Sequence, residues 1–212
     1  LAGPWLADAR PLPLVSDLDR QTLLAAVASY LARRASRLPA APHERGATPA
    51  RLFEMLSFNA GQADALEAWK DRLPEIESRE RLVLTDNKMH AWEWLVMPDG
   101  RILKADALDH HRGNDLVGPQ DIAWDLAGAA VELDLDESEL DDLAAQVARQ
   151  SGTPRAESFQ LDFYTLAYLA FQAGRHTLAA EATAVSVPAE SAALRTAAAR
   201  YAGRLRRSGC GR

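Results

Sequence analysis

The chain has 212 residues, 48% of them hydrophobic, and its 30 acidic and 24 basic side chains give a net charge of −6. This length suits one good-sized domain or two small ones, and the acidic balance argues against a cationic surface for nucleic acid. The single cysteine, Cys210, excludes an internal disulfide framework and a zinc site built on cysteines, which fits a reducing compartment such as the cytoplasm.

No apolar run approaches the ~20 residues that a membrane helix needs, and no signal peptide is visible. We therefore expect a cytoplasmic protein that has neither a membrane nor nucleic acid as a partner.

The first part of the chain is predicted to be an extended segment followed by helices. Residues 1–14 contain three prolines and predict the extended segment. Asp17 or Asp19 offers an N-cap for a helix over 21–38, whose apolar residues recur on one face. Thr48 and Pro49 predict the start of a second helix, which runs to about residue 73, breaks near Gly61 and stops at Pro74.

The pattern then changes from helix to strand. Residues 82–84 predict a short strand, and residues 92–106 predict a β-hairpin with its turn at Pro98-Asp99-Gly100. Residues 107–120 form a polar loop. Trp92, Trp94 and Trp124 are expected to pack around the hairpin, although they could instead wall a pocket.

The rest of the chain is predicted to be helical. Apolar spacing indicates helices over 121–133, 138–151, 158–184 and 188–207. The sequence therefore predicts a mainly α fold in which residues 15–212 form one domain of helices around a single two-stranded hairpin.

The hairpin and the helix after it carry a resemblance to a known superfamily. A first strand begins at Glu93-Trp94-Leu95-Val96 and is followed by a turn with glycine. A second strand ends in Lys104-Ala105-Asp106, and a helix then starts at Asp121-Ile122-Ala123-Trp124-Asp125-Leu126-Ala127. This order resembles that of aminoglycoside phosphotransferases and choline-kinase-like proteins, in which a loop His-x-Asp-x4-Asn leads into two strands, a metal-binding Asp and a GDPxxDLA helix. The resemblance implies the helical C-terminal lobe of a kinase-like fold.

The N-terminal segment fits the same resemblance. The sequence GPWLADARPL is similar to the linker between the two lobes of such kinases, which makes residues 1–14 a candidate hinge. A Gly-rich nucleotide loop is not found in this sequence. The resemblance therefore implies that an N-terminal lobe lies upstream as a partner of this one.

The resemblance also implies roles for individual residues. Glu93 and Asp106 would bind Mg²⁺, and ATP or another NTP would be the phosphoryl donor. Asp125 would hydrogen-bond the backbone of the catalytic loop, with Asp121 as the helix N-cap. The acidic loop from Asp106 to Asp115 could attract a cationic small-molecule substrate.

The catalytic loop departs from the family pattern. Counting back from Glu93 places Lys88 where the family has its catalytic Asp, and Asp86 where it has His. A protonated lysine cannot accept a proton from a substrate hydroxyl. A shift of the loop could let Asp86 serve as the base, whereas Lys88 could pair with Glu93 or Asp106 and stand in for a metal ion.

Each of these residues also has an ordinary structural explanation. Asp106 could cap a turn, Glu93 could be a solvated strand residue, and Asp86 with Asn87 is a common turn pair. Asp121 and Asp125 could simply favour a helix start. A metal site at His110 and His111, with Asp109 and His90, lacks a common helical spacing, and such pairs in polar loops are usually solvated.

Three functions follow from these alternatives. The first is ATP- and magnesium-dependent phosphoryl transfer to a small hydroxylated molecule, with Asp86 as the catalytic residue. The second is a catalytically degenerate kinase-like protein that binds a ligand or a partner without turnover and without a cofactor. The third is a helical interaction domain unrelated to kinases.

Overall fold

The computed structural model describes residues 8–61, 64–106 and 116–209, and within them the mainly helical fold is confirmed. The described residues form two compact units, Leu1–Arg45 with Arg81–Glu157 and Gly46–Glu80 with Ser158–Arg212. The α-helices are α1 (Arg20–Arg37), α2 (Pro49–Ala60), α3 (Leu73–Arg79), α4 (Ile122–Glu132), α5 (Glu137–Ser151), α6 (Ser158–Thr183) and α7 (Pro188–Gly209). Short 3-10 turns are η1 (Leu12–Leu14), η2 (Asp64–Arg72) and η3 (Ala91–Glu93).

Two small antiparallel sheets lie in the first unit. One contains β1 (Arg10–Pro11), β3 (Trp94–Val96) and β4 (Ile102–Lys104), in the order β1-β3-β4. The other pairs β2 (Leu82–Val83) with β5 (Gln120–Asp121). The predicted hairpin is therefore present, and the segment predicted to be extended adds a third strand to it.

Helix ends in the first unit follow their capping residues. Asp19 caps α1 by accepting a hydrogen bond from the Thr22 N–H at 2.8 Å. Asp136 and Glu139 form a reciprocal capping box at the start of α5.

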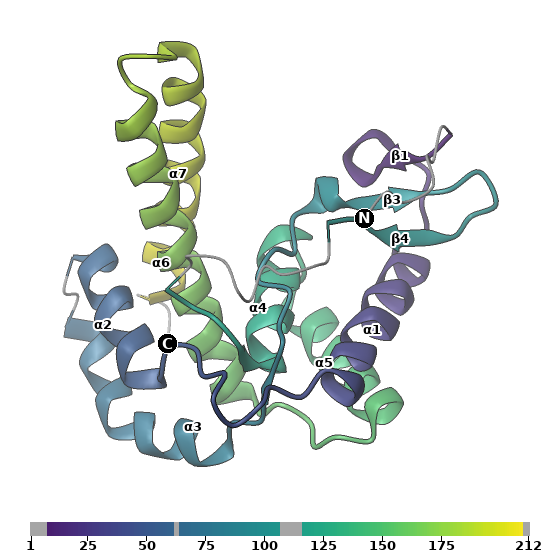
Figure 1. The fold of residues 1–212 in the computed structure, drawn as a ribbon, viewed down its shortest axis with the longest axis horizontal. Helices are drawn as coiled ribbons and strands as arrows, with labels where there is room; N and C mark the ends of the chain where they lie inside the picture. Colours follow the sequence, from purple (N-terminus) through teal and green to yellow (C-terminus); the bar gives the residue numbers. More distant parts are fainter. Residues whose placement is uncertain (1–7, 62–63, 107–115, 210–212) are drawn as a thin grey trace. The chain divides into compact units, whose positions relative to one another are not determined.

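The core of this unit includes α4, in which Ala123, Leu126 and Ala129 are almost fully buried. Helix α4 packs against α1 and α5 (Figure 1).

The second unit corrects one prediction. Pro74 does not stop a helix, because it lies in the first turn of α3, where a missing N–H costs nothing. The predicted helix break near Gly61 is present, since Gly61 caps α2 in the left-handed conformation at φ 76°.

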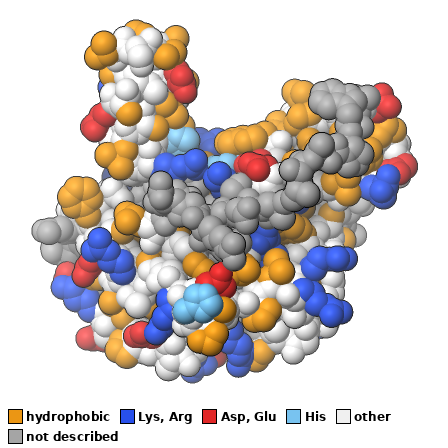
Figure 2. Space-filling view, viewed as in Figure 1, with side chains coloured by type: hydrophobic (Ala, Val, Ile, Leu, Met, Phe, Trp, Pro, Cys, Tyr) orange, Lys and Arg blue, Asp and Glu red, His pale blue; other side chains and the backbone are white. Residues whose placement is uncertain are grey.

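Helices α6 and α7 form an antiparallel pair in the second unit. Hydrophobic side chains gather at the end where the two helices meet (Figure 2), including Leu178, Val185 and Val187. None of the described helices combines the length and the apolar character that crossing a membrane requires.

Candidate active site

The main chain before and after β2 is held in place by two carboxylates at the start of α4, those of the N-cap residue Asp121 and of Asp125 in the first turn. Asp121 accepts hydrogen bonds from the N–H groups of Arg81 and Ala123, each at 2.9 Å. One helical turn later, Asp125 accepts from the N–H groups of Asp86 at 2.7 Å and Asn87 at 2.9 Å. Together the two carboxylates bind the main chain just before β2 and within the loop that follows it.

Asn87 forms the sharp bend of this loop. Its φ of 64° lies in the left-handed region, which asparagine tolerates better than most residues. Its side-chain amide donates to the carbonyl oxygen of Gly118 at 3.1 Å, and Thr85 donates to the same oxygen at 3.3 Å. The loop is therefore fixed from a second direction, by the segment that precedes β5.

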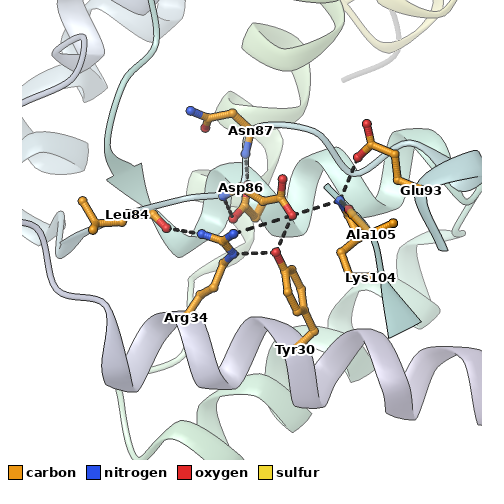
Figure 3. A network of polar contacts seen from close by, with 9 residues as sticks. Tyr30, Arg34, Leu84, Asp86, Asn87, Glu93, Lys104 and Ala105 are labelled. Atoms are coloured by element: carbon orange, nitrogen blue, oxygen red, sulfur yellow. Dashed lines mark hydrogen bonds and ion pairs between the residues drawn. The ribbon is translucent and has the colours of Figure 1, made fainter. Parts of the chain in front are cut away.

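The carboxylate of Asp86 lies at the centre of a buried polar network (Figure 3). Its Oδ2 accepts a hydrogen bond from the hydroxyl of Tyr30 and lies 3.1 Å from the Lys104 ammonium. The guanidinium of Arg34 lies 3.9 Å from the same oxygen, and it also donates to the Tyr30 hydroxyl and to the Leu84 carbonyl. Asp86 is thus surrounded by donors and cations rather than by solvent.

Lys104 connects this network to the hairpin. Its Nζ lies 2.7 Å from Glu93 Oε2 and 3.0 Å from the carbonyl oxygen of Ala105 (Figure 3). The Lys104 side chain is only 1% exposed. Its direction follows from the strand register, because Lys104 pairs with the buried Trp94 and lies on the same face of the hairpin.

Burial and neighbouring charge set the protonation states of the network. Burial raises the pKa of Tyr30, and the Asp86 carboxylate raises it further, so the Tyr30 hydroxyl keeps its proton and donates it. Burial acts to lower the pKa of Arg34, but the carboxylates of Asp125 and Asp86 more than offset this, and its pKa is raised. Arg34 therefore stays charged.

Asp125 gives the network a pH dependence. Burial, followed by the nearby Asp86 charge, raises its pKa from 3.8 to about 6. The native state consequently binds more protons than the unfolded state in that window, so the contribution of Asp125 to stability falls as the pH rises from about 4 to about 6. In urea unfolding across this range, the free energy of unfolding of the native protein should fall relative to that of Asp125→Asn as the pH rises.

The other residues singled out in the sequence lie around this network. Lys88 is half-buried, and none of the ion pairs between described residues includes it. Asp106 follows β4, is exposed and has a φ of 49°. Asp109, His110, His111 and Cys210 lie outside the described residues, as do most of the loop 107–120 and residues 1–7.

The three tryptophans do not all pack as predicted. Trp94 and Trp124 are buried, whereas Trp92 is 53% exposed. The prediction for Trp92 was wrong because the 3-10 turn η3 directs this side chain outward, where it stacks on His90 at 4.2 Å between ring centroids. His90 itself is buried, with its Nδ1 3.1 Å from Glu132 Oε2.

The oxygens of this network do not fit Mg²⁺ as they stand. Magnesium needs oxygen ligands at about 2.0–2.1 Å in octahedral geometry. The carboxylates of Asp86 and Glu93 instead face the Lys104 ammonium at 3.1 and 2.7 Å. Within the part of the chain that the structure describes, no three His, Cys, Asp or Glu side chains form a group that could hold a metal ion.

Three members of the network were missed by the sequence analysis, namely Tyr30, Arg34 and Lys104. Tyr30 and Arg34 are one turn apart on α1. Arginine is rarely buried without a partner, so its position on the apolar face of the predicted helix could have indicated a buried polar contact. Lys104 likewise occupies an inward position of a strand, where a charge requires a partner.

Comparison with solved structures identifies proteins that have a similar fold. The sequence matches no family model and no curated protein. Choline kinase LicA from Streptococcus pneumoniae has a similar structure, with a TM-score of 0.62 at 14% identity over 94% of this chain and 69% of that one. LicA in complex with AMP gives a TM-score of 0.58 at 12% identity over 95% and 68% of the two chains. The chain therefore has the protein-kinase-like fold of these structures.

Proposed function

We propose that this chain, which has a protein-kinase-like fold, is catalytically degenerate and binds a ligand or a partner without transferring a phosphoryl group. The single observation that carries the proposal is the state of Asp86. Its side chain is 0% exposed, and its Oδ2 already contacts the Tyr30 hydroxyl and the Lys104 ammonium. The fold comparison supports a kinase-like protein over an unrelated helical interaction domain.

A catalytic base must reach the proton that it removes. A carboxylate does this with an oxygen within about 3 Å of the substrate hydroxyl. Asp86 has no exposed surface through which a hydroxyl could approach. The position that corresponds to the base by sequence holds Lys88, whose ammonium has no lone pair to accept a proton.

The metal-binding half of a kinase site is altered as well. A divalent cation at Glu93 would have to displace the Lys104 ammonium, which lies 2.7 Å from the Glu93 carboxylate. The displaced lysine would remain within a few ångströms, where its charge opposes that of the metal ion. The same contacts that make the loop stable therefore oppose magnesium binding at Glu93.

An active enzyme is the second candidate, favoured by the fold that this chain shares with a choline kinase, one structure of which holds AMP. ATP and Mg²⁺ would then be needed, the acceptor would be a small hydroxylated molecule, and Asp106 would contribute to the metal site. This candidate requires Asp86 to separate from Lys104 when substrate binds.

A transfer assay separates the two candidates. We would incubate the protein with radiolabelled ATP, Mg²⁺ and a panel of hydroxylated amines that includes choline, with LicA as the positive control. We expect no phosphorylated product above the level of Asp106→Asn, because neither a free base nor a free metal site is available. A product whose formation disappears in Asp106→Asn would instead establish the active enzyme.

A further inference from the structure

The Lys104 ammonium lies in a cage of three oxygen atoms. They are Glu93 Oε2 at 2.7 Å, the Ala105 carbonyl oxygen at 3.0 Å and Asp86 Oδ2 at 3.1 Å, which we call the oxygen cage. An ammonium has three N–H groups, so three acceptors match its capacity. The side chains of Lys104, Glu93 and Asp86 are only 1%, 11% and 0% exposed.

A cation stabilises this arrangement of carboxylates. Two carboxylates from different elements converge on one point, and both are largely removed from water. Without a positive charge between them, they would repel each other at low dielectric, and the Tyr30 hydroxyl and Arg34 would offset only part of the cost of burying them. Arg34 lies farther from Asp86, at 3.9 Å, on the side of α1.

We propose that Lys104 is a built-in structural cation, and that the oxygen cage binds a divalent metal ion when the lysine side chain is removed. Two carboxylate oxygens and a carbonyl oxygen are ligands of the hard type that Ca²⁺, Mn²⁺ and Mg²⁺ prefer. The native protein is then independent of metal ions, because its own lysine fills their place.

The size of the cage selects among these ions. The oxygens lie 2.7–3.1 Å from the nitrogen, and a metal ion would draw them closer. Ca²⁺ binds oxygen at about 2.3–2.6 Å and tolerates irregular geometry, whereas Mg²⁺ requires about 2.0–2.1 Å and an octahedron. Ca²⁺ is therefore the ion that the cage accepts with the least movement, and Mg²⁺ is the one that it accepts least readily.

Two substitutions of Lys104 provide a matched test. Lys104→Ala removes the charge and opens the cage, whereas Lys104→Met removes the charge but leaves an apolar chain inside it. We would measure the melting temperature of each protein in EDTA, CaCl₂, MnCl₂ and MgCl₂ at constant ionic strength. Lys88→Ala, which changes a lysine of the loop after β2 that lies outside the cage, controls for general effects of charge.

We expect both Lys104 variants to melt roughly 10 °C below the native protein in EDTA, because a buried ion pair is broken. Ca²⁺ should restore at least half of that loss in Lys104→Ala and none of it in Lys104→Met. The melting temperature of the native protein should be the same in all four solutions, and so should that of Lys88→Ala. Terbium luminescence excited through tryptophan should appear only in Lys104→Ala, since Trp94 is the strand partner of position 104.

The proposal is overturned if none of the metal ions raises the melting temperature of Lys104→Ala, or if they raise that of Lys104→Met equally. If Lys104→Ala cannot be obtained folded in EDTA, refolding in CaCl₂ decides: recovery supports the oxygen cage and no recovery contradicts it. The inference rests on the same residues as the proposed function, but the readout here is folding. Phosphoryl transfer by the native protein would overturn the proposed function and leave this result unchanged.

Discussion

Replacing Arg34 by methionine is expected to lower the free energy of unfolding by about 3–5 kcal/mol. Arg34 is buried in α1, and its Nε donates to the Tyr30 hydroxyl at 2.7 Å. The same guanidinium donates to the Leu84 carbonyl and lies 3.9 Å from Asp86. Its loss leaves a buried carboxylate short of positive charge and a buried carbonyl short of a donor.

Two further variants locate the cause of the Arg34 effect. Arg34→Lys should recover only part of the lost stability, because a single ammonium cannot reach the Tyr30 hydroxyl and the Leu84 carbonyl together. Arg33→Met changes the exposed neighbour on the same helix and should cost less than about 0.5 kcal/mol. Urea unfolding followed by circular dichroism measures all three. If Arg33→Met and Arg34→Met lower the free energy of unfolding equally, the contacts of Arg34 in the buried network do not contribute to stability.

Removing the carboxylate of Asp125 is expected to have an effect of similar size. Asp125→Ala leaves the buried N–H groups of Asp86 and Asn87 without their acceptor, at a cost of about 1–3 kcal/mol each. Asp125→Asn should cost less, since one acceptor oxygen remains. We expect a total loss of about 3–5 kcal/mol in the alanine variant.

Hydrogen exchange distinguishes a local effect from a general one. In Asp125→Ala the peptide that contains Asp86 and Asn87 should exchange faster than in the native protein, under conditions where α6 remains protected. Asp142→Ala, an exposed acid on α5, serves as the control and should change neither stability nor exchange. Unchanged exchange around Asp86 in Asp125→Ala would mean that the carboxylate does not hold the loop.

Local sequence signals predicted much of the fold. The helices, the hairpin and the mainly α class follow from apolar spacing, caps and turn residues, which act over a few positions. The pairing of β2 with β5 was not predictable in this way, because strands of two residues have no periodicity to detect. The role of Pro74 was misjudged because proline is compatible with both the end and the first turn of a helix.

The candidate site was harder to predict than the fold. From the sequence, Asp125 was expected to bind the loop backbone, and its carboxylate accepts hydrogen bonds from two loop N–H groups. The cation beside Glu93 was expected to be Lys88 or a metal ion, whereas the ammonium found there belongs to Lys104. That position depends on strand register, and a shift of one residue would turn Lys104 to the opposite face.

The hydrogen bonds between the start of α4 and the loop affect how the sequence of this protein can evolve. Asp125 accepts hydrogen bonds from the main-chain N–H groups of Asp86 and Asn87, and Asp121 accepts one from that of Arg81. Every residue except proline supplies such a group, so these hydrogen bonds do not depend on which side chains the loop carries. A loop position whose side chain makes no further contact can therefore change while the path of the chain persists, unlike Asn87, whose φ of 64° and side-chain hydrogen bond to Gly118 form the bend. We therefore expect that substitutions at Lys88, in evolution or by design, have little effect on the stability of the fold.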